Sequence, residues 1–90
     1  MEVKKVAVLG AGAMGGGIAQ VAAAAGFAVV LSDVDRSIVD RALGRINDFL
    51  AKSVEKGKVT AAQKEEIIGR IRPATGIGEE FADADLVIEA

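Results

Sequence analysis

Two short hydrophobic runs flank a glycine-rich segment at the start of the chain. The first run, residues 3–9, is rich in valine and ends at Gly10, which is typical of a strand buried on both faces. Apolar residues then recur at helical spacing over residues 18–25, and Gly26 is placed to end that helix. A second β-branched run over residues 27–31 predicts another strand. This order of strand, helix and strand is a βαβ unit.

A long helical periodicity begins after residue 33. Asp35 is a suitable N-cap for a helix that extends to Gly57. The apolar positions of this helix are Ile38, Ala42, Ile46, Phe49 and Val54. Thr60 and Gln63 have the pattern of a capping box and predict a second helix, over residues 60–71. The two helices form an αα-hairpin.

Two more strands are predicted after the hairpin, which Pro73 ends. They lie at residues 72–75 and 85–90, the latter with three consecutive apolar residues. Right-handed crossovers place the earlier helices on one face of a sheet with strand order 3-2-1-4. The predicted fold class is α/β: a Rossmann-type parallel sheet of three to four strands with an inserted helical hairpin. No repeat or linker divides residues 1–90, so one domain is expected.

An uncharged stretch of 26 residues, 6–31, also resembles a signal peptide or a transmembrane helix. Six of these residues are glycines, and each glycine costs about 1 kcal/mol relative to alanine inside a helix. Gly12 and Gly16 form a pair of the kind used by transmembrane dimers, but the other glycines disfavour one continuous helix. We therefore expect a cytoplasmic protein that does not bind membranes.

The glycine motif GAGAMG follows the first strand and opens the first helix. Gly10 permits a tight turn, Gly12 lets a diphosphate approach the backbone, and Gly15 lets the helix pack close to the strand. Free N–H groups of Ala13 and Met14, with the helix dipole, would hold the diphosphate without any Lys or Arg. The chain is thus predicted to be the first half of a dinucleotide-binding domain, with a merely structural turn as the alternative.

Asp33 lies 18 residues beyond Gly15, at the end of the second strand. A carboxylate there can accept hydrogen bonds from the adenosine ribose, whereas the 2′-phosphate of NADP would meet like charge. Arg36 complicates this choice, because an arginine after this strand can accommodate a 2′-phosphate; its simpler interpretation is a solvated helix residue. NAD is therefore the predicted cofactor, and FAD, which uses the same glycine motif, stays open.

The composition excludes several other kinds of site. Without His or Cys the chain lacks the commonest zinc ligands and the commonest general base, and we predict neither metal-binding nor catalytic residues. The acidic residues between Glu79 and Glu89 are interpreted as a solvated connection and a strand end. A net charge of -2 and the absence of Trp and Tyr argue against nucleic-acid binding.

Four segments together resemble one enzyme family. VAVLGAGAMGGGIAQVAAAAGFAVVLSD, KGKVT, RIRPATG and ADADLVIEA closely resemble the N-terminal NAD-binding domain of 3-hydroxyacyl-CoA dehydrogenases, including bacterial 3-hydroxybutyryl-CoA dehydrogenases. The resemblance assigns to the cofactor Gly10, Gly12, Ala13, Met14, Gly15, Asp33 and Ala90. The first five would contact the diphosphate, Asp33 would contact the adenosine ribose, and Ala90 would lie beside the cofactor.

The resemblance also implies an activity for the family. Its members, oxidoreductases of fatty acid metabolism, oxidise the 3-hydroxyl of an acyl-CoA by hydride transfer to NAD, using a His paired with Glu and assisted by Ser and Asn. Those residues lie beyond the region that this chain resembles, so we expect a truncated NAD(H)-binding fragment without a substrate domain and inactive alone. The alternatives are weak activity after assembly with the missing part, and a structural module that has lost its ligand.

Both faces of the predicted sheet are apolar. Residues on both faces of the first, second and last strands are hydrophobic, yet residues 76–84 are too few for the helices that normally cover the second face. The last strand also leaves an unpaired edge. Because a large exposed apolar patch is rare on a soluble monomer, we expect a homodimer or higher oligomer, joined through the uncovered face or the last edge strand.

Overall fold

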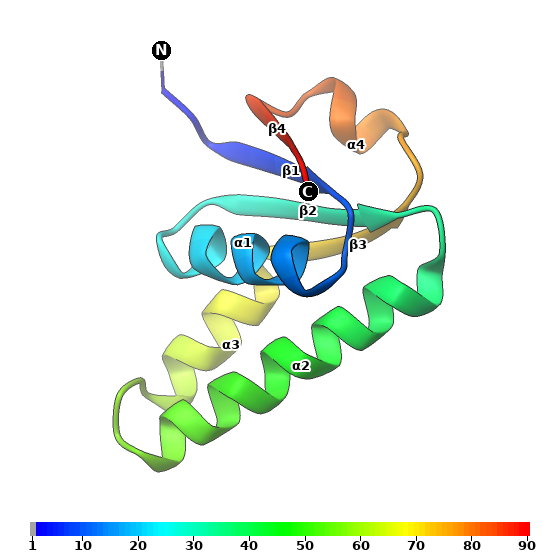
Figure 1. Ribbon diagram of the computed structural model, residues 1–90. Helices are drawn as coiled ribbons and strands as arrows, with labels where there is room; N and C mark the ends of the chain where they lie inside the picture. The colour runs from blue at the N-terminus through cyan, green and yellow to red at the C-terminus, as the bar shows by residue number, and fades with distance from the viewer. Residues whose placement is uncertain (1) are drawn as a thin grey trace.

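A four-stranded parallel sheet organises the computed structural model, which describes residues 2–90 (Figure 1). The strands are β1 (Lys5–Leu9), β2 (Ala28–Asp33), β3 (Ile71–Thr75) and β4 (Leu86–Glu89). The helices are α1 (Ala13–Ala24), α2 (Arg36–Glu55), α3 (Ala61–Gly69) and α4 (Glu79–Ala82). The strand order is β3-β2-β1-β4 and every neighbouring pair is parallel, which confirms the predicted fold class and order.

Local sequence signals fix the end of α1 and the starts of α2 and α3 where they were predicted, whereas α3 stops at Gly69 and Ile71, predicted to be helical, begins β3. Gly26 adopts a φ of 103° just beyond α1, a left-handed conformation that glycine adopts without strain. Asp35 caps α2 by accepting a hydrogen bond from the Ser37 N–H, and Thr60 and Gln63 form both bonds of the capping box of α3. Within residues 2–90, no helix is long and apolar enough to cross a membrane.

The main core lies between the sheet and the three helices α1, α2 and α3, which share one face (Figure 1). Phe49 was predicted to lie on the buried face of α2, and this prediction is wrong, because the residue is 59% exposed. Val39 and Leu50 are buried instead, because together with Ala42 and Ile46 they repeat every three or four residues along one side of the helix.

The opposite face of the sheet carries a smaller core. Phe81, in the single turn of α4, packs with Ala7 and Val30, and all three residues are buried. The prediction that this face is uncovered is therefore wrong over its centre. The aromatic ring of Phe81 covers the apolar residues there, although no full helix packs on this face. Within residues 2–90, no strand pairs with the outer edge of β4, and Leu86 and Val87 are 47% and 52% exposed.

Candidate functional site

The glycine turn between β1 and α1 lies at the carboxyl end of the sheet, and two of its glycines are required by close backbone contacts. Gly10 has a φ of 107°, and a Cβ on it would lie 2.6 Å from the carbonyl oxygen of Ala90. A Cβ on Gly15 would overlap the carbonyl oxygen of Gly10. These two glycines therefore allow α1 and the end of β4 to pack against the turn.

Gly12 differs from both neighbouring glycines of the motif. Its φ of -70° is one that any residue adopts, and a Cβ placed on it would meet no atom within 4 Å. Neither backbone conformation nor packing within residues 2–90 therefore requires glycine here. What glycine provides is an open approach to the backbone of the turn.

The first turn of α1 presents unpaired hydrogen-bond donors to this open space. No side chain caps the helix, and in the described part of the chain the N–H groups of Ala13 and Met14 donate to no acceptor. Both residues are exposed, and the first turn contains no acidic residue. The free N–H groups and the positive end of the helix dipole therefore favour an anion at this position.

Asp33 lies at the end of β2 beside the glycine turn. Its Oδ2 accepts a hydrogen bond from the Ala11 N–H at 2.9 Å, and its Oδ1 accepts one from the Asp35 N–H at 3.3 Å. The Ala11 bond, followed by the Asp35 bond, lowers the pKa of Asp33 below its ordinary value, so the side chain is a carboxylate at neutral pH. A carboxylate has about four acceptor positions, which leaves capacity for further hydroxyl donors.

The sequence predicted the position of Asp33 but not its bond to Ala11. That bond joins the end of β2 to the glycine turn across 22 residues of sequence, and no local pattern signals it. Ala90, at the end of β4, lies against the same turn, where its N–H donates to the Leu9 carbonyl at 2.9 Å. The turn, Asp33 and Ala90 thus meet at the carboxyl ends of the parallel strands.

A hollow of about 440 Å³ adjoins the turn. It is lined by Ala11, Gly12, Ala13, Ile38, Arg41 and Arg45. Of these arginines and Arg36, the sequence suggested only Arg36 as a phosphate ligand. Arg36 instead pairs with Asp40 on the surface of α2, with 3.0 Å between its Nε and Oδ1. The spacing of Ile38, Arg41 and Arg45 by three and four residues was the signal that could have placed both arginines on one side of the helix.

Two acidic residues before β4, Asp83 and Asp85, are engaged at the amino end of the sheet. Asp85 Oδ2 accepts hydrogen bonds from the N–H groups of Lys4 and Lys5, at 2.8 and 3.0 Å. Asp83 pairs with the Lys5 ammonium at 2.6 Å, and this hydrogen bond lowers the pKa of Asp83. These carboxylates position the start of β4 and do not converge on the glycine turn.

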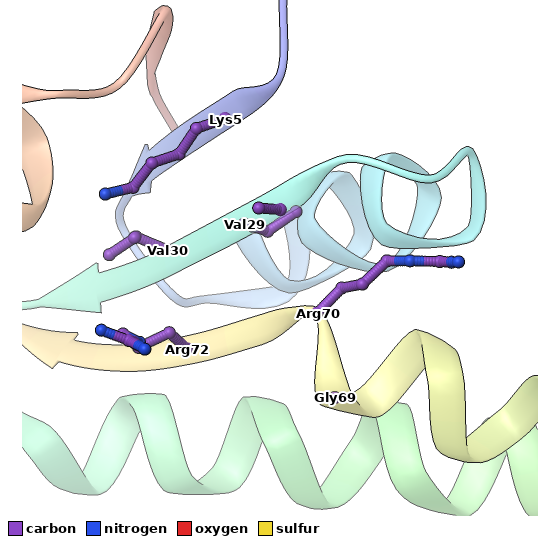
Figure 2. Close-up of a pocket in the computed structure, with 7 residues that line it drawn as sticks. Lys5, Val29, Val30, Gly69, Arg70 and Arg72 are labelled. Atoms are coloured by element: carbon purple, nitrogen blue, oxygen red, sulfur yellow. The ribbon is translucent and has the colours of Figure 1, made fainter.

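A second hollow, of about 430 Å³, lies near the amino ends of β1, β2 and β3 (Figure 2). Three basic residues line it, but Lys5 is paired with Asp83, and Arg70 donates to the Ala23 carbonyl at 2.8 Å. Figure 2 shows Arg70 extending away from Lys5 and Arg72, toward α1. The cations do not meet at one point, and the hollow lies at the wrong end of the strands to share a ligand with the glycine turn.

Comparison with known proteins gives one consistent match. The family model for the NAD-binding domain of 3-hydroxyacyl-CoA dehydrogenase matches residues 5–90. A probable 3-hydroxybutyryl-CoA dehydrogenase of Deinococcus radiodurans is 52% identical over 86 residues, which cover 96% of this chain and 30% of that protein. The fatty acid oxidation complex subunit alpha of Psychrobacter arcticus is 44% identical over 89 residues, which cover 99% of this chain and 12% of that protein.

Solved structures agree with the sequence matches. The crystal structure of a 3-hydroxybutyryl-CoA dehydrogenase from Escherichia coli superposes with a TM-score of 0.94 at 44% identity, covering 99% of this chain and 19% of that one. The (S)-3-hydroxybutyryl-CoA dehydrogenase of Ralstonia eutropha gives the same TM-score at 34% identity, covering 99% of this chain and 31% of that one. The chain therefore spans less than a third of the length of the relatives described here.

Proposed function

Because the chain belongs to the 3-hydroxyacyl-CoA dehydrogenase family, as its NAD-binding domain, we propose that residues 1–90 form one domain that binds NAD(H) across the glycine turn. The family confirms NAD as the predicted cofactor. In this proposal the diphosphate lies over Gly12 and receives hydrogen bonds from the N–H groups of Ala13 and Met14. Gly10 and Gly15 hold the turn in shape.

The adenosine and nicotinamide ends of the cofactor occupy opposite sides of the turn in this proposal. Asp33 accepts hydrogen bonds from the adenosine ribose hydroxyls, for which its free acceptor positions and its negative charge are suited. Ala90, against the turn at the end of β4, lies beside the bound cofactor. The observation that carries the proposal is the open space above Gly12 beside the unpaired N–H groups of Ala13 and Met14, because a diphosphate can approach these donors where Gly12 has no side chain.

The test is a titration of the purified chain with NADH, monitored by the fluorescence of the nicotinamide. We expect saturable binding of NADH and weaker binding of NADPH, because the charge of Asp33 opposes a 2′-phosphate. A folded chain that binds neither nucleotide would identify a structural module that has lost its ligand. Equal or tighter binding of NADPH would contradict the assignment of Asp33.

The reaction of the complete dehydrogenases is a second part of the proposal. We propose that this domain holds the cofactor while 3-hydroxyacyl-CoA oxidation to 3-oxoacyl-CoA requires residues outside these 90. Removing the substrate proton needs a base, the chain contains no His, and Asp33 has a lowered pKa that makes it a weak base. The isolated chain is expected to show no NADH oxidation with acetoacetyl-CoA; measurable turnover by the pure chain would refute this.

Self-association is the third part of the proposal. The open edge of β4 and its half-exposed Leu86 and Val87 can pair with the same edge of a second copy, forming a homodimer with a continuous sheet. Light scattering at tens of micromolar should give the mass of a dimer, and Val87→Lys should lower it to that of a monomer. A wild-type monomer, or a dimer unaffected by Val87→Lys and Leu86→Lys together, would refute the edge-strand interface.

A further inference from the structure

Two arginines of α2 lie beside the glycine turn with most of their hydrogen-bonding capacity unused. Arg41 and Arg45 line the same hollow as Gly12 and Ala13. In the described part of the chain, Arg41 makes only two long contacts, both of 3.4 Å, with the Ser37 carbonyl and hydroxyl. Arg45 has no hydrogen bond or ion pair within residues 2–90. A guanidinium has five donors in a planar arrangement that matches phosphate oxygens.

The hollow also adjoins the position expected for the adenosine ribose. Ala11 lines the hollow and donates its N–H to Asp33 Oδ2 at 2.9 Å. Asp33 is held from two sides, since Asp35 donates its N–H to the other oxygen. A carboxylate fixed in this way stays in place when a ligand arrives, so a 2′-phosphate on the ribose would meet its charge at close range.

Resting on the proposed binding of NAD(H), we infer that Arg41 and Arg45 form a latent subsite for the 2′-phosphate of NADP, which the carboxylate of Asp33 keeps from being used. The chain then carries both elements of cofactor choice: a negative group that rejects the 2′-phosphate and a cationic hollow that can receive it. Arg36, which the sequence suggested for the second role, does not line the hollow, and its Nε pairs with Asp40 instead.

The experiment uses Asp33→Asn, which removes the charge but keeps an amide oxygen able to accept the Ala11 N–H. NADH and NADPH are titrated against the wild-type chain, Asp33→Asn, and Asp33→Asn combined with Arg41→Gln and Arg45→Gln. We expect Asp33→Asn to tighten NADPH binding about tenfold or more, as charge-assisted hydrogen bonds to a phosphate replace repulsion. The two added glutamines should abolish that gain and weaken NADPH binding about tenfold more than NADH binding.

A matched control separates the two arginines from positive charge in general. Asp33→Asn combined with Arg36→Gln removes a cation from the same helix and should keep the full gain in NADPH affinity. The inference is overturned if Asp33→Asn gains no affinity for NADPH, or if Arg36→Gln reduces the gain as much as the changes at Arg41 and Arg45. Failure of the wild-type chain to bind NADH would instead refute the proposed function itself, so the two failures are distinguishable.

Discussion

Substitution of two glycines of one motif should have different effects: at Gly12 it should weaken cofactor binding, and at Gly15 it should lower stability. Gly12→Val places a side chain in open space at a φ of -70°, so the fold should accept it. Loss of glycine from the N-cap costs up to about 1 kcal/mol, and the reduced freedom of the unfolded chain returns about 0.4–1 kcal/mol. The free energy of unfolding should therefore change by less than about 1 kcal/mol.

Cofactor binding should respond much more strongly to the same substitution. The valine side chain would occupy the approach to the N–H groups of Ala13 and Met14, and each hydrogen bond to a charged group contributes about 1.5–3 kcal/mol. Losing both bonds corresponds to roughly a hundredfold or greater loss of NADH affinity. Gly15→Ala is the counterpart: its Cβ would overlap the Gly10 carbonyl, and overpacking of this kind costs about 1–3 kcal/mol or more of stability.

Thermal unfolding by circular dichroism and NADH titration of the same samples measure both effects. Gly12→Val should unfold within about 8 °C of the wild-type chain yet bind NADH at least about a hundredfold more weakly. Gly15→Ala should have a clearly lower Tm. Wild-type NADH affinity in a folded Gly12→Val variant would show that the open space above Gly12 is not the diphosphate position.

Three further predictions concern stability. Thr60→Ala should lower the free energy of unfolding in urea by about 1 kcal/mol through loss of the capping box of α3, with Thr60→Ser as a nearly neutral control and an unchanged Thr60→Ala as the contrary result. Phe81→Ala should cost about 3–5 kcal/mol and increase binding of a hydrophobic dye as Ala7 and Val30 become accessible; a loss below about 1 kcal/mol would show that α4 does not cover the sheet. The lowered pKa of Asp33 means that its carboxylate stabilises the fold at pH values above the ordinary aspartate pKa, and that this contribution is lost as the pH falls through the lowered folded value. Asp33→Asn should therefore show a smaller decrease in urea midpoint between pH 7 and pH 3 than the wild-type chain, and an equal decrease would contradict the Ala11 hydrogen bond.

The parts of the fold that could be predicted from the sequence are those with local causes. A capping box needs only Thr60 and Gln63, and the turn after β1 needs only its glycines, so both are visible within a few residues. Strand order followed from the handedness of short connections, which does not depend on side-chain detail. The strand boundaries differ from the predicted ones by one or two residues, as at β2, which continues through Ser32 and Asp33.

The features that escaped prediction depend on contacts distant in sequence. Phe49 and Leu50 are adjacent apolar residues of α2, and the packing of α2 against the sheet and the other helices decides which one is buried. Phe81 covers the second face of the sheet from a single helical turn, which is too short to show a hydrophobic periodicity in the sequence. At the site, the bond from Ala11 to Asp33 and the approach of Arg41 to the glycine turn both join separate elements. The sequence therefore predicted the cofactor more readily than the surroundings of its phosphates.

Amide chemical shifts of the isotope-labelled chain can show whether NAD(H) binds over the glycine turn. Addition of NADH should shift the amide signals of Ala11, Ala13 and Met14 most strongly, since these groups lie at the turn and two of them would bind the diphosphate. Signals of Lys5 and Arg72, in the hollow at the other end of the strands, should move little. Shifts concentrated at Lys5 and Arg72, or no shifts at the turn at saturating NADH, would contradict the account.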